Sequence, residues 1–272
     1  MSDTTGRAVD LVSRELRYTS VSAIQRFDPN EYGGCQKKWW FRYVEGLREE
    51  QTKQQAAGIE GHSQVEHYLP TGEDVLGPIA AAGRHLLPPP GKDILVEWGL
   101  NDRPRSGETN HFPPEQSLVR ADGVPLIGFI DWINPRGWYM TPEGVWTQDF
   151  ARTMEVGDNK FLSNVAYAKS EPELEQSTQM LGYGMFMLAK YDQLEAVRVS
   201  HVTNQTRGAH TAVKTTAVIS AEAVVKGWAK KGDDVVRRMR EITLVTSEAE
   251  VPGNLESCTA FRKDCDYRSC CS

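Results

Sequence analysis

The sequence predicts an α/β fold in which helices flank a mixed central sheet. The hydrophobic patterns run in the order helices, a nearly contiguous set of strands, a helix, two strands and a helix, which suits one central sheet. The chain has 272 residues, of which 25% are charged, so it is long enough for one large domain or two small ones. This ordinary composition excludes a disordered, collagen-like or coiled-coil chain.

The first ninety residues are expected to be helical after a flexible start. Residues 1–17 are polar and form the expected flexible N-terminus. Ser20 or Ser22 is suited to cap a short helix, and a second helix is expected to begin near Cys35. Two more helices are expected over 55–69 and 76–90.

Strand patterns dominate the middle of the chain. They predict strands at 93–100, 145–151, 154–161, 195–202 and 211–220, and a hairpin over 118–134 that turns at Asp122-Gly123. The remaining segments predict helices over 171–191 and 220–241, followed by a Cys-rich loop.

Charge and hydropathy limit the possible functions. The net charge is −6, so a nucleic-acid role would need a local basic strip or bound metal ions to offset phosphate repulsion. No stretch approaches the roughly 18 apolar residues of a membrane span, and no export signal is evident. We therefore expect a cytoplasmic protein without a membrane partner.

The five cysteines indicate a metal site. Their number is odd and no export signal is evident, so a disulfide framework is not expected. Four of them lie close to the end of the chain, at Cys258, Cys265, Cys270 and Cys271, whereas Cys35 lies near its beginning. Such clustering is typical of a metal-binding segment, whereas scattered reduced thiols would be spread along the chain.

Acidic residues at strand ends are the first candidates for catalysis. Asp131 follows the apolar stretch LIGFI, and Asp158 and Lys160 follow MEVG. Carboxylates hold hard cations such as Mg²⁺ or Mn²⁺, and a lysine beside them can orient or activate water. An exposed turn with an ion pair would show the same pattern. Asp149 is a rival second acid, and Glu97 is a plausible extra one.

Helical residues complete the set of candidates. His62 is a possible metal ligand or a histidine packed at the core edge. Gln179 and Tyr183 are four residues apart, so they share one helix face, as they would if Tyr183 simply belonged to the core.

Taken in chain order, from His62 through the strand acids to Gln179 and Tyr183, the motifs resemble the RecB-like nucleases of the PD-(D/E)XK superfamily. The resemblance is strongest to the iron–sulfur members of that superfamily. Those members include CRISPR-associated, AddB-like and phage exonucleases. The stretches that carry the resemblance are GIEGHSQVEHYL, GFIDW, VGDNKFLSN, QMLGY, the opening TSVSAIQRFDPNEYGGCQKKWWFRYVEGL and the tail CTAFRKDCDYRSCC. They extend from residue 18 to the end of the chain. Phe161 departs from the family, which commonly has Thr after the lysine.

The resemblance implies roles for these residues. His62, Asp131 and Asp158 would hold Mg²⁺ or Mn²⁺, Lys160 would position the attacking water, and Gln179 and Tyr183 would orient DNA or support the site. A [4Fe–4S] cluster would be bound by Cys35, Cys258, Cys265 and Cys271, with Cys270 as a spare or substitute. Structural Zn²⁺ fits the same four cysteines.

The resemblance also implies a restriction-endonuclease-like core within a single nuclease domain. Residues 18–90 would be its helical part, 91–220 its catalytic core and 221–272 a helix with the cluster-binding tail, which would be tied to the N-terminal helices through the cluster.

The implied function is a metal-dependent DNA exonuclease. It would cut single strands or duplex ends in recombination, repair or CRISPR and phage DNA processing, where a protein partner is possible. One alternative is a non-catalytic DNA-binding or adaptor module with a structural metal cluster, and another is a zinc-stapled enzyme acting on small molecules.

Two basic segments are candidate DNA contacts. In one, the cations Lys37, Lys38, Arg42 and Arg48 alternate with Trp39, Trp40, Phe41 and Tyr43. The other consists of Lys226, Lys230, Lys231, Arg237, Arg238 and Arg240, and it would equally suit a solvated helix face.

Overall fold

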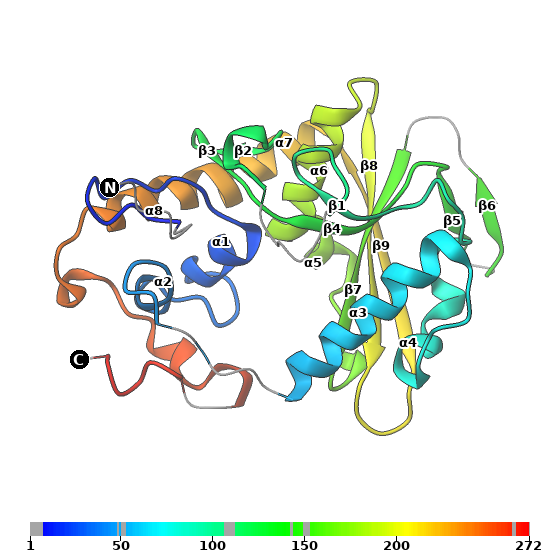
Figure 1. The fold of residues 1–272 in the computed structure, drawn as a ribbon, viewed down its shortest axis with the longest axis horizontal. Helices are drawn as coiled ribbons and strands as arrows, with labels where there is room; N and C mark the ends of the chain where they lie inside the picture. Colours follow the sequence, from blue (N-terminus) through cyan, green and yellow to red (C-terminus); the bar gives the residue numbers. More distant parts are fainter. Residues whose placement is uncertain are drawn as a thin grey trace.

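The protein folds around a five-stranded mixed sheet with helices on both faces (Figure 1). The computed structural model describes residues 8–47, 49, 53–105, 112–141, 144–148, 153–262 and 265–271. In the sheet order, the strands are β1 (Leu95–Gly99), β4 (Phe129–Asn134), β7 (Thr153–Leu162), β8 (Ala196–Gln205) and β9 (Ala212–Ser220). Only β7 and β8 pair in parallel, and the other neighbours are antiparallel. The predicted α/β class with a mixed sheet flanked by helices is confirmed.

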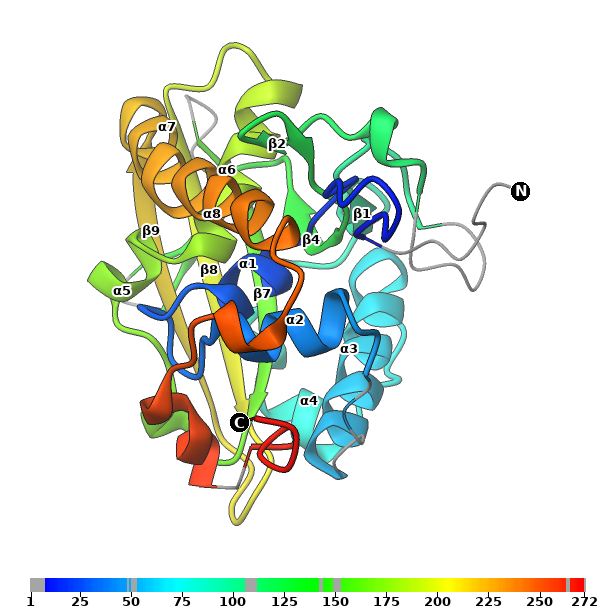
Figure 2. The same ribbon diagram turned by 90° about the vertical axis from the view of Figure 1, so that its left-hand side faces the viewer.

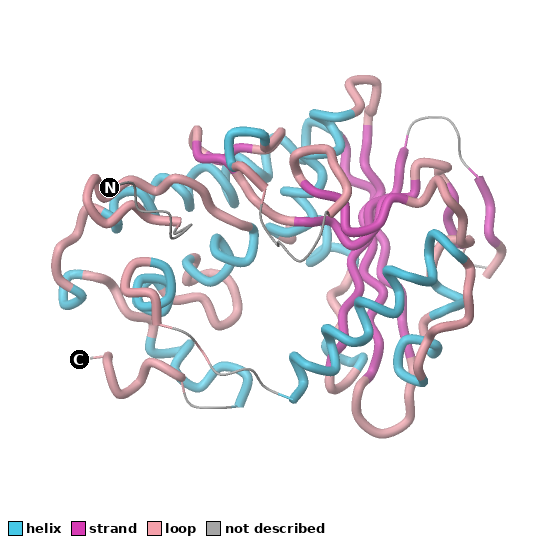
Figure 3. Tube along the Cα trace, viewed as in Figure 1, coloured by secondary structure: helices cyan, strands magenta, loops and turns pink. Residues whose placement is uncertain are grey.

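Helices cover the two faces of this sheet in separate groups. One group, α5 (Glu171–Glu175), α6 (Thr178–Lys190) and α7 (Ala221–Trp228), packs on β8 and β9. The other, α3 (Lys53–Thr71) and α4 (Pro78–Ala82), packs on β1, β4, β7 and β8. Figure 3 shows the strands running together between these layers. Side chains of a strand point alternately to the two faces of the sheet, so successive residues of β7 face opposite helix layers.

The N-terminal helices and the C-terminal tail lie side by side, away from the sheet (Figures 1 and 2). Helix α1 (Val21–Phe27) packs on α2 (Gln36–Tyr43), α6 and α8 (Asp234–Thr243). Ser257 and Asn254 donate side-chain hydrogen bonds of 2.8 and 2.9 Å to the carbonyl of Gly34. The rings of Phe41 and Tyr267 stack with their centroids 5.4 Å apart. The two ends of the chain are therefore held together by direct contacts.

Local sequence signals explain where the first two helices begin. Ser20 caps α1, and its side chain accepts a hydrogen bond from the backbone of Ala23. Cys35 is the residue before α2, as predicted, but its side chain makes no capping bond.

The predicted hairpin is shorter than expected. It is confined to β2 (Arg120–Ala121) and β3 (Val124–Pro125), and Asp122 and Gly123 both adopt the positive φ that a tight turn needs. The rest of the segment forms β4, which pairs with β1 and β7 instead.

Other predicted elements are divided or relocated. The helix expected over 171–191 is broken between α5 and α6, and Ser177 is the residue that directly precedes the second helix. The helix over 220–241 contains a π-helical turn, η4 (Ala229–Asp233), between α7 and α8. The strand expected at 145–151 appears as β6 (Trp146–Gln148), paired with β5 (Trp138–Met140) outside the main sheet.

Part of the segment expected to be flexible packs on the core. Residues 8–17 form a turn closed by the bridge between Val9 and Leu16, whose side chains are both buried. Among the described residues, no helix is both long and apolar enough to cross a membrane.

Candidate functional site

Three carboxylates lie in one row across neighbouring strands. Trp132 of β4 pairs with Gly157 of β7, so the adjacent residues Asp131 and Asp158 face each other one step further along. Glu97 of β1 lies in the same row, because the residues on either side of it pair with those on either side of Asp131. The predicted pair Asp131 and Asp158 is therefore brought together by strand register.

Asp158 is the centre of a buried polar network. One of its carboxylate oxygens lies 2.6 Å from Lys160 Nζ, and the other accepts a hydrogen bond of 2.6 Å from the Gln179 side chain. Gln179 also accepts a bond of 3.0 Å from Lys160 and donates one of 2.9 Å to the Tyr183 hydroxyl. That hydroxyl donates to the carbonyl of Phe129 at 3.2 Å. The i, i+4 spacing on α6 thus places both predicted helix residues over the strand acids.

His62 reaches the same row from the other layer of helices. Its Nδ1 lies 3.0 Å from the Asp131 carboxylate, which also accepts a bond of 2.8 Å from the backbone of Asn159. The His62 ring contacts the ring of Phe161, with the centroids 5.2 Å apart. The Phe161 ring therefore lies beside the histidine and limits the orientations that its ring can adopt.

The charges of these groups depend on one another. Burial would raise the pKa of Asp158, but the charges of Lys160 and His201 outweigh it and hold this pKa below its usual value. Burial would lower the pKa of His62, but its hydrogen bond to Asp131 and the charge of that carboxylate raise it. Burial and the nearby Asp158 charge raise the pKa of Tyr183, which keeps its hydroxyl protonated as a donor.

Glu97 is a strained and electrostatically unfavourable acid. Its φ of 44° is unusual for a residue other than glycine. Burial, followed by the negative charges of Asp131 and Glu66, raises its pKa to about 7. Arg105 lies 3.3 Å from its carboxylate and offsets part of this effect. The plausible extra acid of the sequence therefore does lie at the site.

Sequence patterns did not identify His201. It pairs with Asp158 in the parallel β7–β8 ladder, and its Nε2 lies 4.0 Å from the Asp158 carboxylate. Burial lowers the pKa of His201 to about 4 despite the attraction of Asp158, so at neutral pH this contact is not an ion pair. A histidine in an alternating strand carries no local signal, and only the strand register reveals its position.

The predicted metal ligands are neighbours without forming a coordination shell. Among the described residues, no three His, Cys, Asp or Glu side chains are arranged so that they could hold a metal ion. The reason is visible in the contacts, because His62 and Asp131 bind each other while Asp158 is engaged by Lys160 and Gln179. A cation at this place would have to replace some of these hydrogen bonds. Asp149, the rival second acid, lies outside the described residues.

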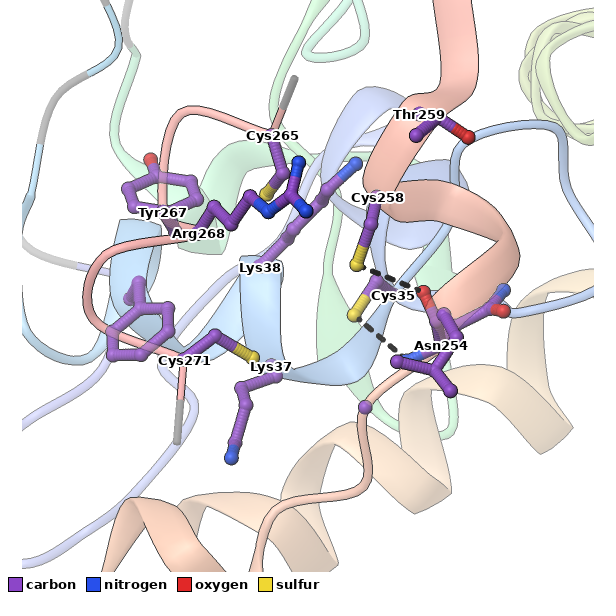
Figure 4. Close-up of a pocket in the computed structure, with 13 residues that line it drawn as sticks. Cys35, Lys37, Lys38, Asn254, Cys258, Thr259, Cys265, Tyr267, Arg268 and Cys271 are labelled. Atoms are coloured by element: carbon purple, nitrogen blue, oxygen red, sulfur yellow. Dashed lines mark hydrogen bonds between the residues drawn. The ribbon is translucent and has the colours of Figure 1, made fainter.

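Four cysteines line a second site between α2 and the C-terminal tail. They border a pocket of about 410 Å³, and Figure 4 shows them around this common space. They are Cys35, Cys258, Cys265 and Cys271. The fifth, Cys270, is exposed and is not among the residues that line the pocket. The cysteines that the sequence separates by more than two hundred positions thus face one space.

Hydrogen-bond donors and cationic side chains surround the pocket, and these groups would stabilise thiolates that bind a metal. The backbone N–H of Asn254 donates to Cys35 Sγ at 3.3 Å. Lys37, Lys38 and Arg268 also line the pocket. Burial raises the pKa of Cys265 and of Cys271, so both thiols favour the neutral form when no cation is bound.

The two candidate basic segments are largely engaged within the protein. Trp39, Trp40 and Phe41 are buried, so these aromatic rings belong to the core instead of forming a stacking surface for bases. In the second segment, Arg238 pairs with Asp28, and Lys231 pairs with Glu31. Arg237 and Arg240 pair with Asp122. Arg48 lies outside the described residues.

Comparisons with known proteins add little to this geometry. No protein-family model and no curated protein sequence matches the chain. One solved structure that resembles it is a provisionally named exonuclease from Eubacterium rectale, with a TM-score of 0.47 and 10% identity. The match covers 100% of this chain and 92% of that one. Because a likeness this distant carries no functional argument, the function has to be inferred from the site.

Proposed function

We propose that the chain is a metal-dependent DNA exonuclease. The observation that carries this proposal is the row formed by Asp131 and Asp158, with Lys160, Gln179 and His62 all in contact with it. Two carboxylates, a lysine and a histidine at one buried point are the groups needed to bind a divalent cation and to orient water for phosphodiester hydrolysis. The substrate would be single-stranded DNA or duplex ends, met in recombination, repair or CRISPR-related processing.

The chemical nature of the donors fits Mg²⁺ or Mn²⁺. His62, Asp131 and Asp158 would hold the cation, whose positive charge would also stabilise the carboxylate form of Glu97. The cation would neutralise phosphate charge and lower the pKa of a bound water. The raised pKa of Glu97, which results from burial and then from the charges of Asp131 and Glu66, is the physical reason to expect a cation beside this row.

The residues of the chain have distinct roles in this proposal. Lys160 donates to the attacking water and stabilises the charge that develops on the phosphate. Gln179 holds Lys160 and Asp158 in register, because it hydrogen-bonds to both. Tyr183 fixes Gln179 and is anchored to the backbone of Phe129.

We further propose that the cysteine pocket holds a [4Fe–4S] cluster through Cys35, Cys258, Cys265 and Cys271. Their number and the cations at the pocket edge fit an anionic cluster with Cys₄ ligation. A structural Zn²⁺ held by the same four cysteines is the alternative.

The experiment is a cleavage assay with an isosteric variant. Protein prepared without oxygen is incubated with end-labelled single- and double-stranded DNA in Mg²⁺, in Mn²⁺ or in chelator. We expect degradation that depends on the metal and that falls by at least about 100-fold in Asp158→Asn, since loss of a charged group at a reacting centre has effects of this order. Asp192→Asn is the matched control, because Asp192 is exposed on a loop.

The same assay distinguishes the enzyme from a non-catalytic DNA-binding module. For an enzyme, Lys160→Ala removes cutting but leaves most DNA binding intact. Protein that retains its cluster, binds DNA and cuts in no metal would instead support the binding module and contradict the nuclease.

A further inference from the structure

Strands β4 and β7 separate at the proposed active site. Their ladder ends with the pair Trp132 and Gly157, so Asp131 and Asp158 are the first residues beyond it. Strand β7 continues to pair with β8 past this point. Beyond the ladder, the backbone N–H of Asn159 donates to the Asp131 carboxylate at 2.8 Å. The separation of the strands thus turns a backbone donor of the sheet toward a proposed metal ligand.

The side chain of Asn159 donates to the same carboxylate oxygen. Its Nδ2 lies 3.4 Å from Asp131 Oδ2, the oxygen that also accepts the bond from its backbone. His62 Nδ1 lies 3.0 Å from this oxygen as well. Three donors therefore converge on Oδ2, which offers about two lone pairs. Within the described part of the chain nothing donates to Oδ1, so the two oxygens of Asp131 have different surroundings.

Asn159 is an unfavourable residue for packing at its position. It is 2% exposed and pairs with Val202, which belongs to the apolar cluster that includes Trp132 and Phe161. Its Oδ1 is buried and accepts no hydrogen bond from the described residues. A buried amide with an unsatisfied oxygen reduces stability, and an apolar side chain would suit these neighbours better. The contact with Asp131 therefore explains this amide better than packing does.

We propose that Asn159 is a positioning residue, which turns Asp131 Oδ1 toward the bound cation. This inference rests on the proposed metal-dependent function. Because Oδ2 is held by Asn159 and His62, the rotation of the carboxylate is restricted and Oδ1 remains for the cation. Hydrogen bonds to a ligating carboxylate fix its orientation and tune metal affinity. The Asp131 side chain is 14% exposed, so an ion can reach it from solvent.

The same arrangement gives the two ring nitrogens of His62 different roles. Nδ1 faces Asp131, so Nε2 is the nitrogen left for the cation. A histidine that ligates a metal through one nitrogen commonly donates from the other to a carboxylate. His62 and the backbone of Asn159 would still hold Oδ2 without the Asn159 amide. Removing that amide should therefore weaken the binding of the cation without abolishing it.

Binding of Mn²⁺ in the absence of DNA tests this role. Calorimetric titration of protein prepared without oxygen compares the parent with Asn159→Ala, and Asp158→Asn identifies the contribution of the site. We expect Asn159→Ala to weaken Mn²⁺ binding about tenfold, the lower end of the range for a residue that supports a metal ligand. Asn204→Ala is the matched control, because Asn204 is another buried amide whose Oδ1 accepts no bond from the described residues. It should bind Mn²⁺ like the parent.

Thermal unfolding in chelator separates positioning from packing. The variants Asn159→Ala and Asn204→Ala should have similar melting temperatures, since each removes one buried amide from the same side of the sheet. Asn159→Leu fills the space with an apolar side chain that cannot donate a hydrogen bond. It should be at least as stable as Asn159→Ala and should still bind Mn²⁺ weakly.

The outcomes separate this inference from the proposed function. If Asp158→Asn binds Mn²⁺ less tightly than the parent while Asn159→Ala binds like Asn204→Ala, the positioning role is wrong and the cation site stands. Recovery of parental affinity in Asn159→Leu would show that Asn159 serves only packing, and it would overturn the inference too. If the parent binds Mn²⁺ no better than Asp158→Asn, the proposed cation site is wrong and the positioning role is wrong with it.

Discussion

Two histidines face the same row of carboxylates and respond to it in opposite ways. His62 is hydrogen-bonded to Asp131, and this contact raises its pKa despite burial. His201 lies 4.0 Å from Asp158, too far to be compensated, so burial lowers its pKa to about 4. The hydrogen bond to Asp131 therefore separates His62 from His201, whose pKa the charges of Lys160 and Lys169 lower further.

The depressed pKa of His201 makes the free energy of unfolding depend on pH. The unfolded chain binds a proton near pH 6.5 and the folded chain only near pH 4, so stability falls as the pH decreases between these values. The shift corresponds to a loss on the order of 3 kcal/mol. We expect the free energy of unfolding of His201→Gln to fall less than that of the parent between pH 6.5 and pH 4. Urea unfolding at several pH values, in chelator, measures this difference.

His62 supplies a control of opposite sign. Because its folded pKa is raised, its contribution is complete below the unfolded value and is lost as the pH increases through the folded one. Removing His62 should therefore make the free energy of unfolding depend less on pH on the alkaline side. Identical pH profiles for the parent and His201→Gln would show that His201 is not held neutral.

At the scale of elements, the site depends on how closely α3 approaches β7. A Cβ added at Gly61 would lie 2.2 Å from a ring carbon of Phe161, whereas one at Gly58 would lie 3.9 Å from the nearest atom of that residue. The absence of a side chain at Gly61 lets the Phe161 ring fill the space beside His62. The close helix–strand contact and the orientation of the histidine therefore have one cause.

This contact predicts different effects of alanine at two positions of the same helix. Gly61→Ala forces the Phe161 ring aside and should reduce the free energy of unfolding by about 1–3 kcal/mol, as overpacking does. Gly58→Ala meets ordinary contact distances and should be neutral or stabilising by up to about 1 kcal/mol. Urea denaturation of both variants measures the difference. Equal stability of the two would contradict the close packing.

At the scale of the whole molecule, the two ends of the chain form one unit. The Gly34 carbonyl accepts bonds from the tail, and Phe41 stacks on Tyr267, so the four pocket cysteines are held near one another without any cofactor. A cluster bound there would link the N-terminal helices to the tail covalently. Loss of the cluster would be expected to weaken the packing of the N-terminal helices and of the tail.

Adjacent cysteines in the tail allow a stringent test of the proposed cluster. Cys271→Ser should lose bound iron and the visible absorption of the cluster, and its melting temperature should fall. Cys270→Ser should retain about four iron atoms per chain, because Cys270 does not line the pocket. Iron analysis of protein prepared without oxygen measures both. Stoichiometric zinc in place of iron would favour the structural zinc alternative, and equal iron in both variants would exclude Cys271 as a required ligand.

Much of the candidate site is encoded locally and could be predicted from the sequence. The i, i+2 spacing of Asp158 and Lys160 places both on one side of a strand, and the i, i+4 spacing of Gln179 and Tyr183 places both on one side of a helix. The order of helices and strands follows from the same periodicities. These spacings follow from the local geometry of a strand and of a helix, so these parts of the prediction agree with the structure.

Other features were decided only by tertiary structure. His201 meets Asp158 through the register of two strands, and Phe41 stacks on Tyr267 through the packing of the two ends of the chain. The burial of Trp40 likewise depends on its neighbours in space. Contacts between residues far apart in the chain depend on how the elements pack, and no local spacing records them. The sequence by itself determined which groups each element presents, and the packing of the elements decided which groups meet.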